Sequence, residues 1–251
     1  CTALQRLPSI SFAGCASLYR TPVGLEELED LEALDVTGCS SLASIEAVER
    51  LRMLEVINLR NCQSLESFPT ATLRRLTRLR VITVEGCTRF DTIDISGFAS
   101  LEALPIGLSS LQRLRSVEMR GCNGLHELSA LSLAGCESLE QLPAGLEELV
   151  GLEALDISGC ASLTELPNEL LRKLTKLQTL QMGNCTALRK LTSLSLAGCA
   201  SLTKPPGGLD ELTELVALDM SGCTSLITLC TVLRKLELIK AAGCTSLATL
   251  E

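Results

Sequence analysis

Cysteine is the residue type in this chain with the widest chemical range, because thiols form disulfides, bind metals and act as nucleophiles. The 251 residues include 13 cysteines. Twelve of them occupy the same slot of a recurring segment, and only Cys230 lies outside that slot. There is no Cys-x-x-Cys pair and no Cys/His pairing, so the sequence predicts neither a metal site nor a cofactor.

The shared slot itself favours a structural role for these cysteines. A Cys that recurs in one slot of a repeat is typically buried, where it behaves as a small apolar residue with a weak donor. We therefore predict a ladder of buried, reduced thiols, with disulfides as the alternative. Many free thiols favour a reducing, intracellular compartment, either the cytoplasm or an organelle interior. The predicted ladder comprises Cys15, Cys39, Cys62, Cys87, Phe98, Cys122, Cys136, Cys160, Cys185, Cys199, Cys223 and Cys244, with Cys1 in the same slot.

The other candidates for catalysis are a single histidine and a few recurring carboxylates. His126 follows a ladder cysteine, and no motif positions a Ser or Cys nucleophile with it. We interpret it as a surface-loop histidine. Asp35, Asp156 and Asp219 occupy equivalent repeat positions, which indicates duplication rather than one converged acid–base pair. The sequence predicts no catalytic residues, and we do not expect an enzyme.

The elements that position these residues follow from the recurring motif Leu-x-x-Leu-x-Leu-x-x-Cys-x-x-Leu. Its cleanest copies are 31–42, 152–163 and 191–202. Each Leu-x-Leu core predicts a short strand with alternate residues inward, and stacked copies make these strands parallel. Segments 104–111 and 142–149 predict short helices or 3-10 turns. The best predicted helix is 168–180, with Asn168 as its N-cap.

The spacing of the ladder slot is uneven. Most successive copies lie about as far apart as Cys15 and Cys39, but three intervals are little more than half as long, and the interval from Cys87 to Phe98 is the shortest. Similar segments also recur at a longer period, which predicts duplicated units of three turns near 1–61, 62–121, 122–184 and 185–243. We predict one array of about 13 turns over 1–251, a fragment lacking both caps. We expect strands in the short copies. The alternatives are a convex side without a helix at these copies, irregular loops in place of strands, or an imperfect sequence.

With this motif the chain resembles a leucine-rich-repeat protein, and its Gly-Cys-x-Ser-Leu variant resembles repeats of plant intracellular immune receptors and of protist and algal arrays. The resemblance covers nearly the whole chain. It implies an α/β solenoid: a horseshoe with parallel strands on the concave face and short helices or 3-10 turns on the convex face. It also implies a module that binds proteins or other ligands. No Gly-x-x-x-x-Gly-Lys-Ser/Thr loop of a nucleotide-binding domain is present.

Charge and hydropathy narrow the class of partner. The net charge of −8 and pI near 4.9 disfavour nucleic acids and anionic membrane surfaces. No apolar run reaches the length of a transmembrane helix. We therefore predict a non-enzymatic protein-binding or scaffold module. The alternatives are a structural linker subunit permanently embedded in a larger multiprotein complex, and the recognition part of a longer receptor.

Two sets of residues are candidates for the binding surface. The first is a polar row between the second and third Leu of each copy, expected to run along the concave face as Ser11, Asp35, Asn58, Thr83, Asp94, Glu118, Ser132, Asp156, Gln181, Ser195, Asp219 and Lys240. The second is a charged patch, favoured because Arg is enriched in interfaces. The predicted protein-binding residues of this patch are Arg60, Arg80, Glu85, Arg115, Glu118 and Arg120.

Overall fold

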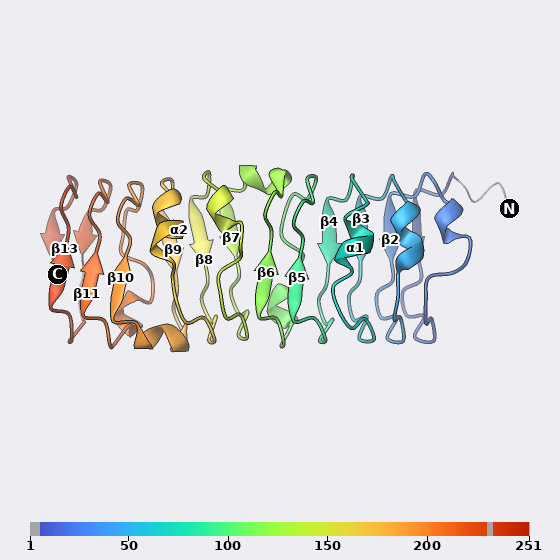
Figure 1. Cartoon of the computed structure of the whole chain (residues 1–251), viewed down its shortest axis with the longest axis horizontal. Helices are drawn as coiled ribbons and strands as arrows, with labels where there is room; N and C mark the ends of the chain where they lie inside the picture. Colours follow the sequence, from blue (N-terminus) through green and yellow to red (C-terminus); the bar gives the residue numbers. More distant parts are fainter. Residues whose placement is uncertain (1–5, 230–232, 251) are drawn as a thin grey trace. The chain divides into compact units, whose positions relative to one another are not determined.

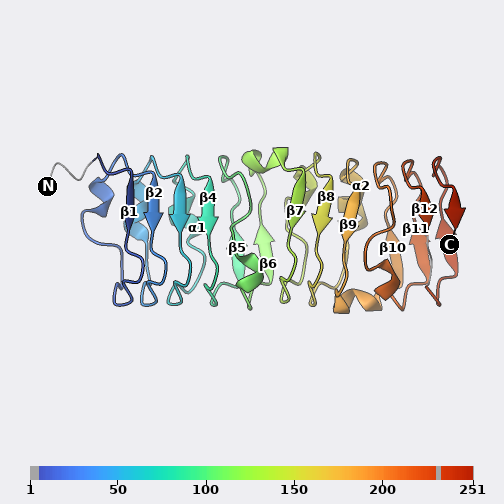
Figure 2. The same ribbon diagram turned by 180° about the vertical axis from the view of Figure 1, so that it is seen from behind.

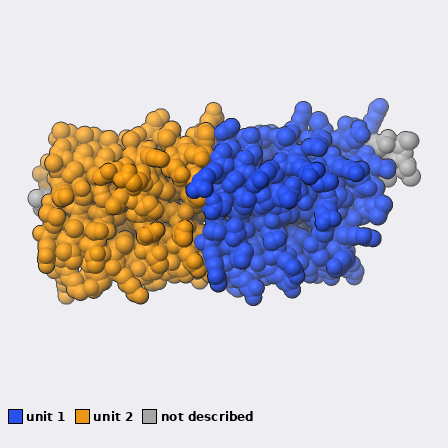
Figure 3. Space-filling view, viewed as in Figure 1, with its two compact units in different colours: residues 1–125 blue, residues 126–251 orange. Residues whose placement is uncertain are grey.

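The computed structural model describes residues 6–229 and 233–250, so the positions of Cys1 and Cys230 in the predicted pattern lie outside the described residues. The chain divides into two compact units, coloured separately in Figure 3. Unit 1 is Cys1–Leu125 and unit 2 is His126–Glu251. Each unit is built from stacked solenoid turns of short parallel strands, as the repeat motif predicts.

The strands of unit 1 form two separate sheets. The first contains β1 (Ser9–Ser11), β2 (Ala33–Asp35), β3 (Val56–Asn58) and β4 (Val81–Thr83), paired in parallel and in chain order. The second pairs β5 (Thr92–Asp94) with β6 (Ser116–Glu118). Short helices connect them: η2 (Leu25–Glu27), η3 (Glu46–Arg50), α1 (Thr70–Leu73) and η4 (Leu108–Ser110).

Unit 2 repeats this arrangement with three sheets. They are β7 (Ala130–Ser132), β8 (Ala154–Asp156) and β9 (Thr179–Gln181); β10 (Ser193–Ser195), β11 (Ala217–Asp219) and β13 (Leu238–Lys240); and β12 (Thr228–Leu229) with β14 (Thr249–Leu250). The helices are η6 (Leu146–Glu148), α2 (Asn168–Lys173), η7 (Thr186–Lys190) and η8 (Leu209–Glu211), and η5 (Asn123–Glu127) contains the division between the units.

Helix α2 is shorter than the sequence predicts. It ends at Lys173 instead of continuing to residue 180, because Leu174 and Leu177 lead directly into β9 and are buried with the strand leucines. Its N-cap is Pro167, without a side-chain capping bond, so the expected N-cap role of Asn168 is wrong. The predicted short helices within 104–111 and 142–149 are confirmed as the 3-10 helices η4 and η6.

The short repeats form regular strands, as expected, but they change sheet. The shortest interval, from Cys87 to Phe98, separates β4 from β5. The sheet of β4 nevertheless continues, because Thr83 forms a parallel bridge with Ile106 in the segment between β5 and β6. Figure 1 shows the β5 and β6 arrows pointing opposite to β4. A short interval therefore advances the chain by about half a solenoid turn, so that its strand falls in the second sheet.

The same change occurs inside unit 2. The short interval from Cys185 to Cys199 separates β9 from β10, and the first sheet continues through a bridge between Gln181 and Gly207. In Figure 2 the arrows of β8 and β10 point in opposite directions. A duplicated unit with two full intervals and one short interval is therefore two and a half turns long. The motif copies are therefore not all full turns, and the duplicated units and the array of about 13 turns stay predictions.

The core is a column of leucines and ladder residues stacked between neighbouring turns. The inward strand residues Leu34, Ile57 and Ile82 are each at most 1% exposed. Before each ladder residue the backbone turns with positive φ, a conformation that Gly adopts readily and Asn tolerates. This explains why the preceding position holds Gly in most copies and Asn at Asn61 (φ 58°) and Asn184 (φ 62°).

Candidate functional site

The cysteine ladder is a set of internal hydrogen bonds. The Sγ atom of Cys62 donates to the Val36 carbonyl at 3.2 Å, and that of Cys87 donates to the Leu59 carbonyl at 3.0 Å. In each case the carbonyl lies three residues before the ladder residue of the preceding turn. The same pattern joins Cys122 to Ile95, Cys160 to Leu133, Cys185 to Ile157, Cys223 to Leu196 and Cys244 to Met220.

Burial makes these thiols poor nucleophiles. Desolvation raises the pKa of Cys62 to about 12 and that of Cys87 to about 11, so neither forms an appreciable thiolate near neutral pH. All cysteines that the structure describes are free thiols, and Cys15 is the exposed one among them. The buried ladder thiols therefore stabilise the stack and are poor candidates for a reactive site.

Two copies that follow a sheet change differ from the rest. Phe98 fills the slot with an apolar ring and is 4% exposed. Cys199 donates instead to the Leu171 carbonyl of α2, at 3.6 Å. In both copies the preceding strand of the motif lies in the other sheet, so the usual carbonyl is displaced from the slot.

The predicted polar row is wrong as a single continuous face, because the strands belong to different sheets. Register pairing gives four shorter rows: Ser11–Asp35–Asn58–Thr83, Asp94–Glu118, Ser132–Asp156–Gln181 and Ser195–Asp219–Lys240.

Several residues of these rows serve the backbone. Asp219 Oδ1 accepts the Ser221 backbone N–H at 2.9 Å, and Asp156 accepts that of Ser158 at 2.9 Å. Partial burial alone would raise the pKa of Asp219, but the Ser221 hydrogen bonds and nearby Lys240 hold that pKa below its ordinary value. Such side chains close the bend after each strand.

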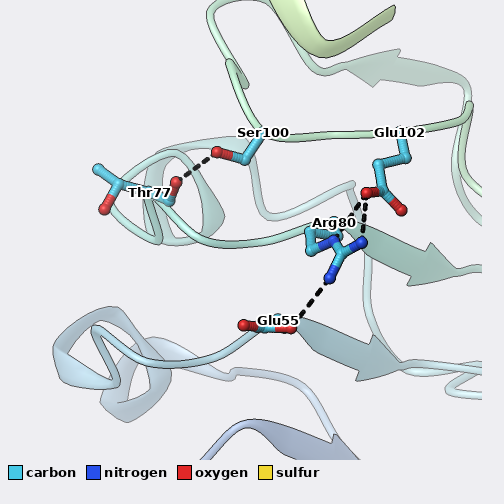
Figure 4. Close-up of polar contacts among 5 residues, drawn as sticks. All are labelled: Glu55, Thr77, Arg80, Ser100 and Glu102. Carbon is cyan, nitrogen blue, oxygen red and sulfur yellow. Dashed lines mark hydrogen bonds and ion pairs between the residues drawn. The ribbon is translucent and has the colours of Figure 1, made fainter.

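The predicted charged patch is divided in the same way. Arg60 forms an ion pair with Glu85 near β3 and β4. Arg80 lies between the carboxylates of two neighbouring turns, with its Nε 2.8 Å from Glu102 and an Nη 3.5 Å from Glu55 (Figure 4). Beside it in the figure, Ser100 Oγ donates to the Thr77 carbonyl at 2.7 Å. These arginines are engaged in stacking the turns.

The other three members of the patch belong to the second sheet of unit 1. Arg115 precedes β6 and its backbone N–H donates to Asp91, at 2.8 Å. Glu118 lies in β6, and the Arg120 carbonyl accepts the Gly97 N–H at 2.9 Å. The six predicted residues are therefore divided between the two sheets of unit 1, and their role in protein binding stays a prediction.

The remaining chemical candidates are isolated. His126 lies in η5 rather than in a loop, with Nε2 3.6 Å from Glu148 Oε2. Within residues 6–229 and 233–250, no group of three or more His, Cys, Asp or Glu side chains could hold a metal ion. None of the described helices is long and apolar enough to cross a membrane.

The most distinctive surface of unit 1 surrounds its single tyrosine. Tyr19 is 69% exposed and Val23 is 88% exposed. Tyr19 lines two hollows, of about 360 and 420 Å³, that also share Ser44 and Glu46. The first hollow continues over Pro22 and Val23, and the second continues over Ile45, Glu66 and Pro69.

A third hollow continues this surface along the stacked turns. It measures about 610 Å³ and shares Glu66 with the second hollow. Its other lining residues are Thr88, Arg89, Gln112 and Arg113. We call the three hollows together the Tyr19 groove. The groove has an aromatic and apolar end at Tyr19 and a basic end at Arg89 and Arg113.

The backbone of successive turns supports the groove. The Ala43 N–H donates to the Tyr19 carbonyl at 2.9 Å, and Arg20 bridges Ser44 in parallel. Further along, β5 and β6 pair Thr92 with Ser116, which places Arg89 and Arg113 at equivalent positions three residues before the pair. The groove therefore crosses the turns and its side chains are spaced by the stacking distance.

Sequence reasoning missed this groove, although one signal was available. Four residues after the ladder slot, other copies carry mostly polar residues such as Glu66, Asp91, Glu102 and Glu140, whereas the first described copy carries Tyr19. The fold requires no large ring at this exposed slot. When an exposed residue departs from the repeat pattern and is not needed to pack the core, it indicates a candidate binding surface.

Comparisons with known proteins give distant similarities. Neither a protein-family model nor a curated protein matches the sequence. An internalin from Listeria monocytogenes is 17% identical, over 100% of this chain and 88% of that chain, with a TM-score of 0.40. A leucine-rich-repeat protein of T. pallidum is 22% identical, over 67% and 77%, with a TM-score of 0.41. The functional domain of InlJ from Listeria monocytogenes, which includes a cysteine ladder, is 17% identical over 96% and 64%, with a TM-score of 0.31.

The fold assignment rests on the chain itself. The leucines of the motif are buried, the strands that they form pair in parallel from one turn to the next, and short helices connect the strands. These are the defining features of one repeat architecture. The chain is a leucine-rich-repeat α/β solenoid.

Proposed function

We propose that this chain is a non-enzymatic protein-binding module and that unit 1 binds an extended segment of its partner in the Tyr19 groove. The observation that carries the proposal is the exposure of Tyr19 beside Val23, at two adjoining hollows. Tyr is enriched in protein interfaces because it combines a large contact area with low conformational entropy. No packing role within the array accounts for its position.

The mechanism is rigid display. Parallel strands and ladder hydrogen bonds fix the backbone of each turn, so the groove side chains are held at set spacings before binding. A preformed surface loses less conformational entropy when a partner docks. The partner segment would lie along the stacked turns, with an apolar side chain against Tyr19.

The proposal is tested by selection from a phage-displayed library of random peptides against the full chain. Peptides that bind the groove should lose affinity for Tyr19→Ser by about tenfold or more, as expected for an interface anchor. Ile227→Ser is the matched control, because Ile227 is also exposed (52%) at the equivalent slot of a unit 2 copy. Failure to select any peptide that depends on Tyr19 would refute the proposal.

The proposed location is a reducing compartment of the cell. Its support is the run of buried thiols, most of which donate to a backbone carbonyl, a bond that a disulfide would require to break. The measurement is titration of thiols with a maleimide after denaturation of the natively expressed protein. All 13 cysteines should react, and extensive blocking would contradict the proposal.

A further inference from the structure

The basic end of the Tyr19 groove differs in charge from the Tyr19 end, whose first hollow is lined by one arginine, Arg20, and two glutamates, Glu26 and Glu46. Arg89 and Arg113 line one hollow, with Thr88 and Gln112 as further hydrogen-bonding side chains. Glu66 is the acidic residue among the described lining residues, and its Oε1 lies 3.6 Å from an Nη of Arg89. The hollow therefore has a net positive charge in a chain whose net charge is −8.

The geometry of the two arginines suits a carboxylate. Equivalent residues of neighbouring turns are about 4.8 Å apart, the separation of paired strands. Arginines whose backbones are this far apart and that line one hollow can both reach a single anion, and a guanidinium group matches the planar carboxylate well. The 3.6 Å contact with Glu66 is an exposed, long ion pair, which is weak enough for a ligand to displace.

From these observations we propose that the Tyr19 groove binds an extended acidic peptide segment, with one carboxylate between Arg89 and Arg113 and an apolar side chain against Tyr19. This inference rests on the proposed function, because it names the chemistry of the partner at the same groove. The other end favours acidic residues less, because Glu26 and Glu46 outnumber Arg20 in the hollow beside Tyr19. The two ends thus fix the direction in which the segment binds.

The length of the groove sets the spacing within the peptide. Four stacking steps separate the turn of Tyr19 from that of Arg113, a distance of about 19 Å at 4.8 Å per step. An extended chain covers this distance in roughly six residues. We expect bound segments to carry an apolar or aromatic residue and an Asp or Glu roughly six positions apart.

The experiment extends the phage selection with synthetic versions of the selected peptides. Affinities are measured by fluorescence anisotropy for each peptide and for its Glu→Gln or Asp→Asn counterpart. Arg113→Gln should weaken the acidic peptide by about three- to fivefold and leave the neutral counterpart unchanged. Glu66→Gln should strengthen the acidic peptide by about twofold, because a competing carboxylate is removed.

The control is Arg172→Gln, which removes an exposed arginine from α2 in unit 2, where it pairs with Glu169. It should not alter affinity. Two outcomes would overturn this inference while the proposed function stands. In the first, the peptides that depend on Tyr19 carry no acidic residue. In the second, their affinity is the same for wild type, Arg89→Gln and Arg113→Gln. If no selected peptide depends on Tyr19, both this inference and the proposed function are refuted.

Discussion

At the scale of single residues, the cysteines show how one side chain can satisfy two demands of a stacked fold. The slot after each strand is buried, and a carbonyl of the preceding turn, which already accepts one backbone N–H, faces it and has room for a second hydrogen bond. Cys fits the volume and donates weakly through Sγ. The thiol therefore recurs along the array for packing and hydrogen bonding, without any reactive role.

Replacing a ladder cysteine tests this interpretation. Cys62→Ala removes the donor to the Val36 carbonyl and leaves a small void. The free energy of unfolding should fall by about 1–3 kcal/mol, measured by urea denaturation. Cys15→Ala, at the exposed copy, should change it by less than about 0.5 kcal/mol. Equal effects at both positions would contradict a structural ladder.

The raised thiol pKa values predict instability in alkali. An unfolded thiol ionises near its ordinary pKa of 9.0, whereas folded Cys160 stays protonated until about pH 12 because of desolvation. The stabilisation is complete below pH 9 and is lost as the pH rises from 9 to 12, since only the unfolded state releases the proton. Thermal melts at increasing pH should show this decline.

Cys160→Ala separates this effect from other alkaline titrations. The variant cannot ionise at that position, so its melting temperature should fall less steeply than that of the wild type once the pH exceeds the ordinary thiol pKa. Parallel curves for the two proteins would show that the thiol does not contribute to the pH dependence.

At the scale of elements, the half-turn intervals decide which sheet receives each strand. Some of the segments that precede a short helix are also constrained, because they pass close to the neighbouring turn. Gly107 precedes η4 with φ 97°, and a Cβ atom added there would lie 2.6 Å from Glu85 Cα. Gly24 precedes η2 with φ 90°, but nothing lies within 4 Å of its added Cβ.

This pair of glycines separates backbone strain from steric overlap. Gly24→Ala should cost about 1–2 kcal/mol, the energy of holding a left-handed conformation. Gly107→Ala adds a clash with backbone atoms and should cost at least about 2 kcal/mol more. Both values come from equilibrium urea unfolding. If the two variants were equally stable, the close approach of Gly107 to Glu85 would be disproved.

At the scale of the whole molecule, stability should depend on neighbouring turns, because a solenoid has no contacts between distant repeats. Deleting residues 137–160 removes one full turn, from one ladder cysteine to the next in the same sheet. We expect a folded protein with a lower urea midpoint and an m-value reduced by roughly a tenth, in proportion to the surface lost.

The matched variant deletes 137–154, about three quarters of a turn. This length moves the following leucines out of register with the preceding sheet, so the cooperative transition should be lost or shifted to much lower urea than in the full-turn deletion. Circular dichroism during urea titration provides the measurement. Equal midpoints for the two deletions would show that register does not control folding of unit 2.

The amino-acid sequence by itself determined the repeat, the strands and the inward leucines, because these depend on the local alternation of apolar residues and on a fixed spacing. It also identified the ladder slot that holds Cys62 and Phe98. Which sheet receives each strand was decided only in three dimensions, since the sheet depends on the accumulated rotation of the chain and not on any local motif. For that reason Arg60 and Arg120 lie by different sheets, although their sequence contexts are similar. The Tyr19 groove likewise depends on the tertiary structure, because stacking places residues that are one repeat apart in the sequence side by side.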